Sequence, residues 1–246
     1  MTSRSRRVWC SRGCSRWLVS SELLTVWRQG AFKVPEGQAG PWRVVRSFIT
    51  PRQAAENQRQ AEAFGGPVRY SPAGFYTALV RDGDVWMADT PDEMLDHLEC
   101  FEQAKARGGR VLIHGLGLGL IARAVLSLEN VTHVDVVEVD YDVIKLVRPA
   151  FINHVQNGRM SIRHGDCFSN RWLPEDRWTV VWHDIWQGMV EENLPEMDRL
   201  HRLFADRCDW QGSWGEQWIL EQRSRRIRYG NELGVEQPPV AVYRPD

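Results

Sequence analysis

The residues best suited to chemistry form a glycine-rich turn that is followed by a single carboxylate. Gly115, Gly117 and Gly119 alternate directly after the apolar run 110–114, and Glu138 ends a second apolar run. Gly115 permits a tight turn, Gly117 lets the backbone approach a ligand, and Gly119 lets a helix pack closely on a strand. Glu138 stands where an acid binds ribose hydroxyls. The pattern predicts a βαβ nucleotide-binding unit; the alternative is the same unit with an empty loop.

The spacing of the glycines bears on which nucleotide is bound. A dinucleotide fingerprint would place a small residue at position 120, where this chain has Leu120. The turn also lacks the Lys-Ser/Thr pair of a P-loop. Gly-x-Gly-x-Gly with a later acid resembles motif I of the class I S-adenosylmethionine-dependent methyltransferases, which implies S-adenosyl-L-methionine (SAM) as the cofactor.

Acidic residues also end the third and fourth apolar runs. Residues 160–166 end in Asp166, and residues 178–184, apolar enough to be buried on both faces, end in Asp184. Because ligands of doubly wound sheets bind beyond the carboxyl ends of the strands, we expect the glycine turn, Glu138, Asp166 and Asp184 to lie together. A loop or an acid after each of four successive strands predicts a ligand site at that edge.

The remaining sequence predicts the elements that hold these residues. Capping boxes at Thr50–Gln53 and Thr90–Glu93 each open a helix, and Asp82-Gly83 marks a hairpin turn. In chain order, we expect a strand at 43–49, a helix at 50–65, a hairpin at 75–88, a helix at 90–107, a helix at 140–155 bent by Pro149, a helix at 195–208, and a further helix from about Gln217.

Alternating strands and helices imply an α/β fold with a doubly wound, mainly parallel, Rossmann-like sheet. We expect four parts: a poorly ordered basic segment at 1–42, a helix and β-hairpin extension at 43–107, the SAM-binding domain at 108–228, and a tail at 229–246. Residues 1–17 carry five arginines and no acid. We interpret these residues as a disordered or upstream-extended terminus; a basic arm and a transit-like segment are the alternatives.

Composition excludes several classes. The chain has 31 basic and 32 acidic residues, so no global basic field indicates a nucleic-acid partner. No apolar run reaches membrane-spanning length. The five cysteines are scattered, and Cys10 and Cys14 lack a second pair, so we expect no metal site. A reduced, cytoplasmic protein is expected, with a homodimer as a candidate assembly.

Three features resemble the spermidine-synthase-like branch of the methyltransferase superfamily. They are the hairpin and capped helix at 80–95, Glu138-Val-Asp140, and His164-Gly-Asp166-Cys-Phe. The resemblance implies ribose contact by Glu138, adenine contact by Asp166 and contact of the turn with the methionine end. It implies cofactor binding by Gly115, Leu116, Gly117, Gly119, Glu138, Val139, Asp166 and Cys167.

The sequence departs from that branch at three places. Aminopropyltransferases carry two acids three apart after the fourth strand, whereas Asp184 is followed by Gln187. Their Tyr-His pair corresponds here to Leu95-Asp96, with His97 close by. A standard domain also adds a fifth strand and a hairpin after residue 208, where Trp210, Trp214 and Trp218 recur every four residues, so we expect a shortened C-terminal end.

Asp184 is the best candidate to bind or deprotonate an acceptor, or else it caps the next helix. Trp186 is a candidate to stack on the acceptor. His183 is expected on the opposite face, and His114 is expected to be structural rather than the pocket floor. The sequence thus predicts a SAM-dependent methyltransferase with an unidentified acceptor. An aminopropyltransferase and a non-catalytic SAM-binding or assembly protein are the alternatives.

Overall fold

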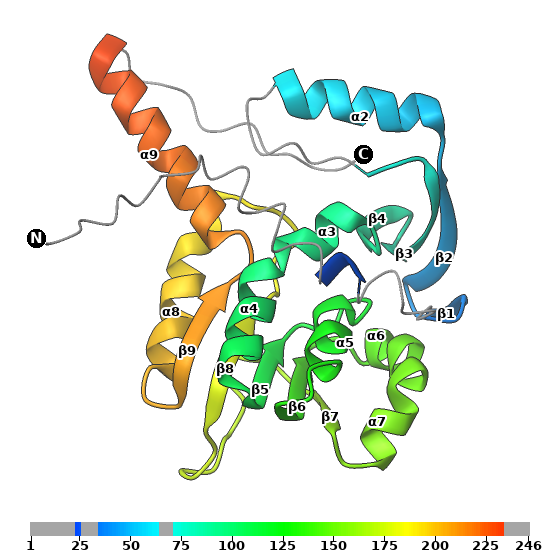
Figure 1. Cartoon of the computed structure of the whole chain (residues 1–246), viewed down its shortest axis with the longest axis vertical. Helices are drawn as coiled ribbons and strands as arrows, with labels where there is room; N and C mark the ends of the chain where they lie inside the picture. Colours follow the sequence, from blue (N-terminus) through cyan, green and yellow to red (C-terminus); the bar gives the residue numbers. More distant parts are fainter. Residues whose placement is uncertain (1–22, 26–33, 64–70, 234–246) are drawn as a thin grey trace, which may run out of the picture.

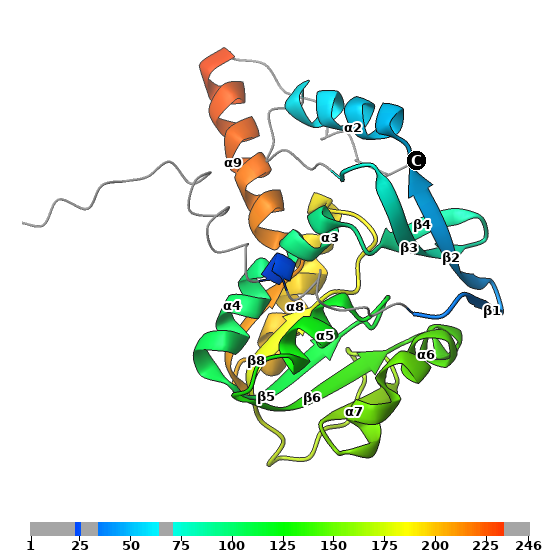
Figure 2. The same cartoon turned by 45° about the vertical axis from the view of Figure 1, so that its right-hand side comes forward.

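The computed structural model describes residues 23–25, 34–63 and 71–233. Two sheets make up this part: a four-stranded sheet near the N-terminus and a five-stranded sheet (Figures 1 and 2). Most of the basic segment expected at 1–42 lies outside the described residues. Its end is structured, because the first strand, β1 (Gly37–Ala39), precedes position 43. None of the described helices combines the length and apolar character needed to cross a lipid bilayer.

The N-terminal sheet is antiparallel and has the order β1-β2-β3-β4. Its other strands are β2 (Trp42–Ile49), β3 (Gly74–Arg81) and β4 (Asp84–Ala88). The hairpin prediction is confirmed, since Asp82 and Gly83 both have positive φ, 51° and 102°, as a tight primed turn requires. The first capping box also forms: Gln53 N donates to Thr50 Oγ1 (3.2 Å) at the start of α2 (Pro51–Ala63).

The helix expected at 90–107 is two helices, α3 (Pro91–Asp96) and α4 (Leu98–Arg107). Thr90 Oγ1 accepts a hydrogen bond from Glu93 N (3.3 Å), which confirms the second capping box. His97 lies at the junction and is fully buried, with 1% of its surface exposed. The break therefore places an imidazole in the interior, above the end of the central sheet.

The central sheet has the strand order β7-β6-β5-β8-β9, and all its neighbours are parallel. Its strands are β5 (Gly109–His114), β6 (Val131–Glu138), β7 (Met160–His164), β8 (Trp178–His183) and β9 (Cys208–Ser213). The chain enters the sheet at the central strand β5 and adds β6 and β7 on one side. It then crosses over to add β8 and β9 on the other side. This is the doubly wound, Rossmann-like topology that the sequence predicts.

Different elements cover the two faces of this sheet. One face packs Val111 and Ile113 against α4, α5 (Leu120–Leu126) and α6 (Tyr141–Val147). The chain continues through a 3-10 helix, η1 (Arg148–Phe151), and α7 (Ile152–Gln156), so Pro149 does interrupt the helix expected at 140–155. The other face packs against α8 (Leu194–Phe204), which follows the short η2 (Glu191–Asn193).

A fifth strand, β9, corrects the expectation of a shortened sheet. Residues 208–213 pair with β8 in parallel, and Trp210 stacks on Trp182 with ring centroids 6.2 Å apart. The four-residue recurrence of tryptophans hid this strand. A side chain at Gly212 would crowd the rings of Trp210 and Trp182, which explains a glycine inside a strand. The chain then enters α9 (Glu216–Leu233), which extends past the expected boundary at 228, and no C-terminal hairpin occurs among the described residues.

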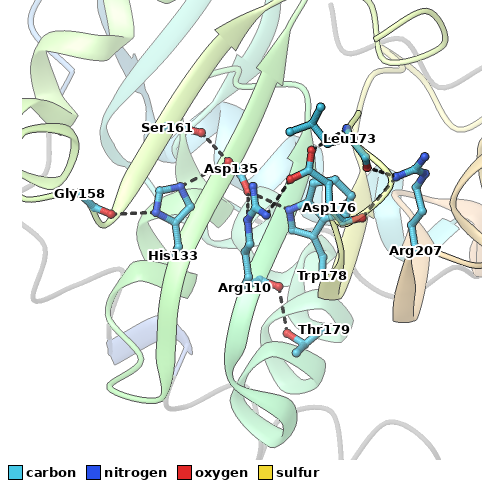
Figure 3. Close-up of polar contacts among 10 residues, drawn as sticks. All are labelled: Arg110, His133, Asp135, Gly158, Ser161, Leu173, Asp176, Trp178, Thr179 and Arg207. Atoms are coloured by element: carbon cyan, nitrogen blue, oxygen red, sulfur yellow. Dashed lines mark hydrogen bonds and ion pairs between the residues drawn. The ribbon is translucent and has the colours of Figure 1, made fainter. Parts of the chain in front are cut away.

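The connection from β7 to β8, residues 165–177, is a loop without a helix. A polar network on neighbouring strands anchors this region (Figure 3). The buried Asp135 carboxylate accepts from Arg110 Nε (2.7 Å), Trp178 Nε1 (2.8 Å) and Ser161 Oγ (2.6 Å). Arg110 Nη1 continues to Asp176 Oδ1 (3.0 Å), at the end of the loop. The network therefore ties the end of this loop, at Asp176, to β5.

Candidate active site

A cavity of about 250 Å³ lies at the carboxyl ends of β5, β6 and β8, beneath the N-terminal hairpin. The residues that line it from the central sheet and the segments that follow its strands are Gly115, Gly117, Val137, Glu138, Val139, Asp140, Val143, Gly165, Asp166, Cys167, Phe168, Asp184, Ile185, Trp186, Gln187 and Trp214. Residues from the N-terminal part are Trp42, Leu79, Arg81, Trp86, Met87 and Glu93. The structure thus brings the acids at successive strand ends around one cavity.

The glycine turn is tightly held in the conformation that its residue types predict. Gly115, Gly117 and Gly119 have φ of 92°, 47° and 76°, which favour glycine. A Cβ on Gly115 would collide with the carbonyl oxygen of Asp184, and one on Gly119 would collide with the ring of Phe151. Gly119 therefore packs against the helical region after β6, while Gly115 makes room for the end of β8.

The Glu138 carboxylate forms hydrogen bonds with the glycine turn. Its Oε2 accepts from Leu116 N (2.8 Å) and its Oε1 from Asp140 N (2.8 Å). Burial raises the pKa of Glu138, whereas these backbone hydrogen bonds oppose the rise. Glu138 borders the cavity and shapes the turn at the same time.

Asp184 borders the cavity at the end of β8. Burial raises its pKa to about 8, and the negative charges of Glu93 and Glu138 contribute to the rise. His97 Nε2 lies 3.8 Å from Asp184 Oδ2. A carboxyl with a pKa near neutrality beside an imidazole is the arrangement expected of a proton acceptor.

The other predicted site residues lie around the same cavity, with two exceptions. Val139, 68% exposed, and Trp186 border it, and Trp186 Nε1 donates to Glu196 Oε2 (2.9 Å). Asp166 borders it and accepts from Phe168 N (2.9 Å), while burial raises the pKa of Cys167 to about 12, so its thiol is not a nucleophile. Leu116 and Gly119 belong to the turn without lining the cavity.

His183 and His114 lie away from the cavity, as the sequence predicts for His183. Both are fully buried, their Nδ1 atoms are 2.8 Å apart, and both pack on Phe204. His183 Nε2 meets Gln211 Oε1 at 3.3 Å, whereas His114 Nε2 has no hydrogen-bond partner among the residues that the structure describes. Neither imidazole is among the residues that line the cavity.

The residues that the N-terminal sheet contributes to the cavity lining were not predicted from the sequence. Trp42 Nε1 donates to Asp140 Oδ2 (2.6 Å), and the Trp42 and Trp86 rings meet edge to face at 5.2 Å. The Arg81 guanidinium lies over both rings, at 5.3 and 5.7 Å. Tryptophans and an arginine in the hairpin strands were the available signal, but pairing in space, not spacing in sequence, brings them to the cavity.

The cavity lining is acidic. Among the described residues that border it, the carboxylates are Glu93, Glu138, Asp140, Asp166 and Asp184, and the only basic side chain is that of Arg81. Arg81 is also partly neutralised by Asp82 Oδ2 at 3.8 Å. Such a lining favours a cationic ligand and disfavours an anionic one. Within the described ranges, no three His, Cys, Asp or Glu side chains are grouped to hold a metal ion.

Comparison with known proteins bears on this site. Residues 89–186 match the family model of the spermine/spermidine synthase domain. No curated protein matches the chain. Together with the strand order, the match supports a class I methyltransferase-like fold of the spermidine-synthase-like branch. The matched stretch includes the glycine turn, Glu138, Asp166 and Asp184.

Solved structures are similar at low identity. Spermidine synthase from Thermotoga maritima is 15% identical, with a TM-score of 0.44 over 80% of this chain and 62% of its own. The CcbJ methyltransferase from Streptomyces caelestis is 20% identical, with a TM-score of 0.36 over 45% of this chain and 43% of its own. A Podospora anserina methyltransferase with bound S-adenosylhomocysteine is 17% identical, with a TM-score of 0.38 over 47% and 52%. The chain thus spans less than two thirds of each of these proteins.

Proposed function

We propose that this protein is a transferase that binds SAM and methylates a small, amine-bearing acceptor. The observation that carries the proposal is the convergence of the glycine turn, Glu138 and Asp184 on one acidic cavity. When bound, SAM supplies a methyl group on a positively charged sulfur. The acidic lining favours that charge, and the exposed side chain of Val139 offers an apolar surface to the adenine.

The residues of the chain account for binding and proton transfer. Glu138 and the turn would hold the ribose and the methionine end, and Asp166 the adenine amine. Asp184 would accept the proton of the acceptor nitrogen, which a pKa of about 8 suits. Trp186 and Trp214, which border the same cavity, would stack on the acceptor and exclude water.

Aminopropyl transfer from decarboxylated SAM is the second candidate. It is favoured by the family match over 89–186 and by the acidic lining, which suits a cofactor without a carboxylate. It is disfavoured by Gln187, a neutral residue that borders the cavity three positions after Asp184. A non-catalytic role would be favoured if missing strands left the acceptor pocket open; β9 supplies the fifth strand, whereas no C-terminal hairpin occurs among the described residues.

Isothermal titration with SAM, S-adenosylhomocysteine, decarboxylated SAM and NAD tests cofactor binding. We expect micromolar binding of the sulfur nucleosides and none of NAD. Transfer to a panel of mono- and diamines is then measured with each labelled cofactor, using Asp184→Asn as the matched inactive variant. Labelled methyl on an amine supports the proposal, labelled aminopropyl supports the second candidate, and binding without any turnover contradicts both.

A further inference from the structure

Met87 in β4 covers the glycine turn. Its Sδ accepts a hydrogen bond from Leu118 N at 3.1 Å, and it lies so close to Gly117 that a Cβ there would collide with the sulfur. A β-bulge between Leu79 and Val80, opposite this part of β4, sets the direction of the strand. Met87 therefore links the N-terminal hairpin to the turn that is expected to hold the methionine end of the cofactor.

Three other backbone donors of the turn are committed to strong oxygen acceptors. Gly115 N bonds to Val137 O (2.8 Å) and Gly119 N to Leu116 O (2.7 Å). Leu116 N bonds to the Glu138 carboxylate (2.8 Å), and Gly117 N–H acts to lower the pKa of that carboxyl. Leu118 N–H alone is given to a thioether, which is a weak acceptor. It is thus a donor of the turn that an incoming ligand can take at low cost.

A ligand carboxylate needs such a donor here. Five carboxylates border the cavity, and Arg81, the only basic residue among the described ones that line it, lies over two tryptophan rings. A carboxylate that enters without a hydrogen-bond donor pays desolvation and repulsion together. Displacing Met87 would free Leu118 N–H for it, whereas a nucleoside without a carboxylate needs no such displacement.

We propose that Met87 is a specificity-determining residue, which covers Leu118 N–H and thereby discriminates against nucleosides whose tail ends in a carboxylate. This inference rests on the nucleoside site of the proposed function, and it favours decarboxylated SAM over SAM as the cofactor. It concerns the methionine end alone, because the ribose and adenine contacts are assigned to Glu138 and Asp166, on other strands. It predicts that SAM binds only with displacement of the Met87 side chain.

Titration calorimetry with two ligands tests the inference without a turnover assay. S-adenosylhomocysteine carries the amino-acid tail, and 5′-methylthioadenosine has the same nucleoside and thioether without it. We expect Met87→Ala to lower the ratio of their dissociation constants (homocysteine form over methylthioadenosine) by about tenfold, the factor of one hydrogen bond to a charged group. Met87→Leu, which keeps an apolar cover on the turn, should leave the ratio within about twofold of wild type.

The outcomes separate this inference from the proposed function. If both ligands bind and Met87→Ala leaves the ratio unchanged or raises it, Met87 is not a specificity residue and the inference fails alone. A ratio that falls equally in Met87→Leu also overturns it, since the cover is then irrelevant. If neither wild type nor variant binds 5′-methylthioadenosine, the nucleoside site is absent and the proposed function fails together with the inference. Thermal unfolding of each variant confirms that it is folded.

Discussion

Trp182 determines the tautomer of His97, so that the nitrogen facing Asp184 carries the proton. Trp182 Nε1 donates to His97 Nδ1 at 3.3 Å, and an indole nitrogen is only a donor. His97 Nδ1 must therefore be unprotonated, and the proton of the neutral ring sits on Nε2, 3.8 Å from Asp184 Oδ2. That distance is long for a hydrogen bond, but catalytic contacts often tighten only when ligands bind. The carboxyl of Asp184 thus has a fixed donor in front of it.

The first prediction concerns the pH dependence of turnover. Asp184 must be ionised to accept a proton, and its pKa is raised to about 8 by burial. The rate should therefore rise from pH 7 to 9 with an apparent pKa near 8, and Asp184→Asn should lower kcat by at least about a hundredfold. Initial rates with labelled SAM measure both. A rising limb that persists in Asp184→Asn would assign the titration to another group.

The second prediction tests whether the N–H group of His97, rather than the size of its side chain, affects the pKa of Asp184. His97→Phe removes the N–H that stabilises ionised Asp184, so the pKa of Asp184 should rise. His97→Gln places an amide donor near the former Nε2 and should restore the wild-type pKa. Carbon-13 NMR of labelled aspartate follows this titration without turnover. Equal pKa values in all three proteins would reduce His97 to a packing residue.

Much of the fold was predictable because its signals are local. The hairpin follows from Asp82-Gly83, and the capped helices follow from Thr50 and Thr90. The strand β9 was not predictable in this way. Its tryptophans repeat as in a helix, and the extended form is stabilised by contacts between distant segments, namely the pairing with β8 and the stacking of Trp210 on Trp182.

The candidate site was predictable where it depends on strand order. Glu138, Asp166 and Asp184 converge because parallel strands end at one edge. Met87 and Arg81 reach the same cavity from the N-terminal part, and His97 lies beside Asp184; their placement depends on how that part packs on the sheet. No spacing in the sequence encodes such packing, so these residues needed the structure.

The third prediction concerns Glu138, whose two oxygens both accept backbone N–H groups, from Asp140 and Leu116. Glu138→Gln must turn an amide NH₂ toward one of these donors. We expect a loss of about 1–3 kcal/mol in unfolding free energy and at least about tenfold weaker binding of S-adenosylhomocysteine, about 1.4 kcal/mol. Urea denaturation and calorimetry measure the two effects, with the exposed Glu175→Gln as control. Unchanged affinity would refute the ribose role.

The fourth prediction follows from the buried imidazole pair. Gln211 Nε2 donates to His201 O (2.9 Å), so its Oε1 accepts from His183 Nε2. His183 Nδ1 is then the acceptor and His114 Nδ1 the donor in their 2.8 Å contact. Burial lowers the pKa of His114 to about 3 and, with the charge of His114 adding to burial, lowers that of His183 well below its usual range.

Both histidines therefore stay neutral in the folded state while the unfolded chain takes up protons below about pH 6.5. Stability from this source is present above that pH and is lost as the pH falls, by about 2 kcal/mol per histidine between pH 7 and 5. His114→Asn keeps an amide donor for His183 but does not titrate, so its unfolding free energy should fall by about 2 kcal/mol less than that of wild type over this range. Urea denaturation at the two pH values measures the difference, in which the opposing effect of Asp184 cancels. Parallel pH dependence in both proteins would mean that His114 is protonated in the folded state, and the tautomers derived from Gln211 would then be wrong.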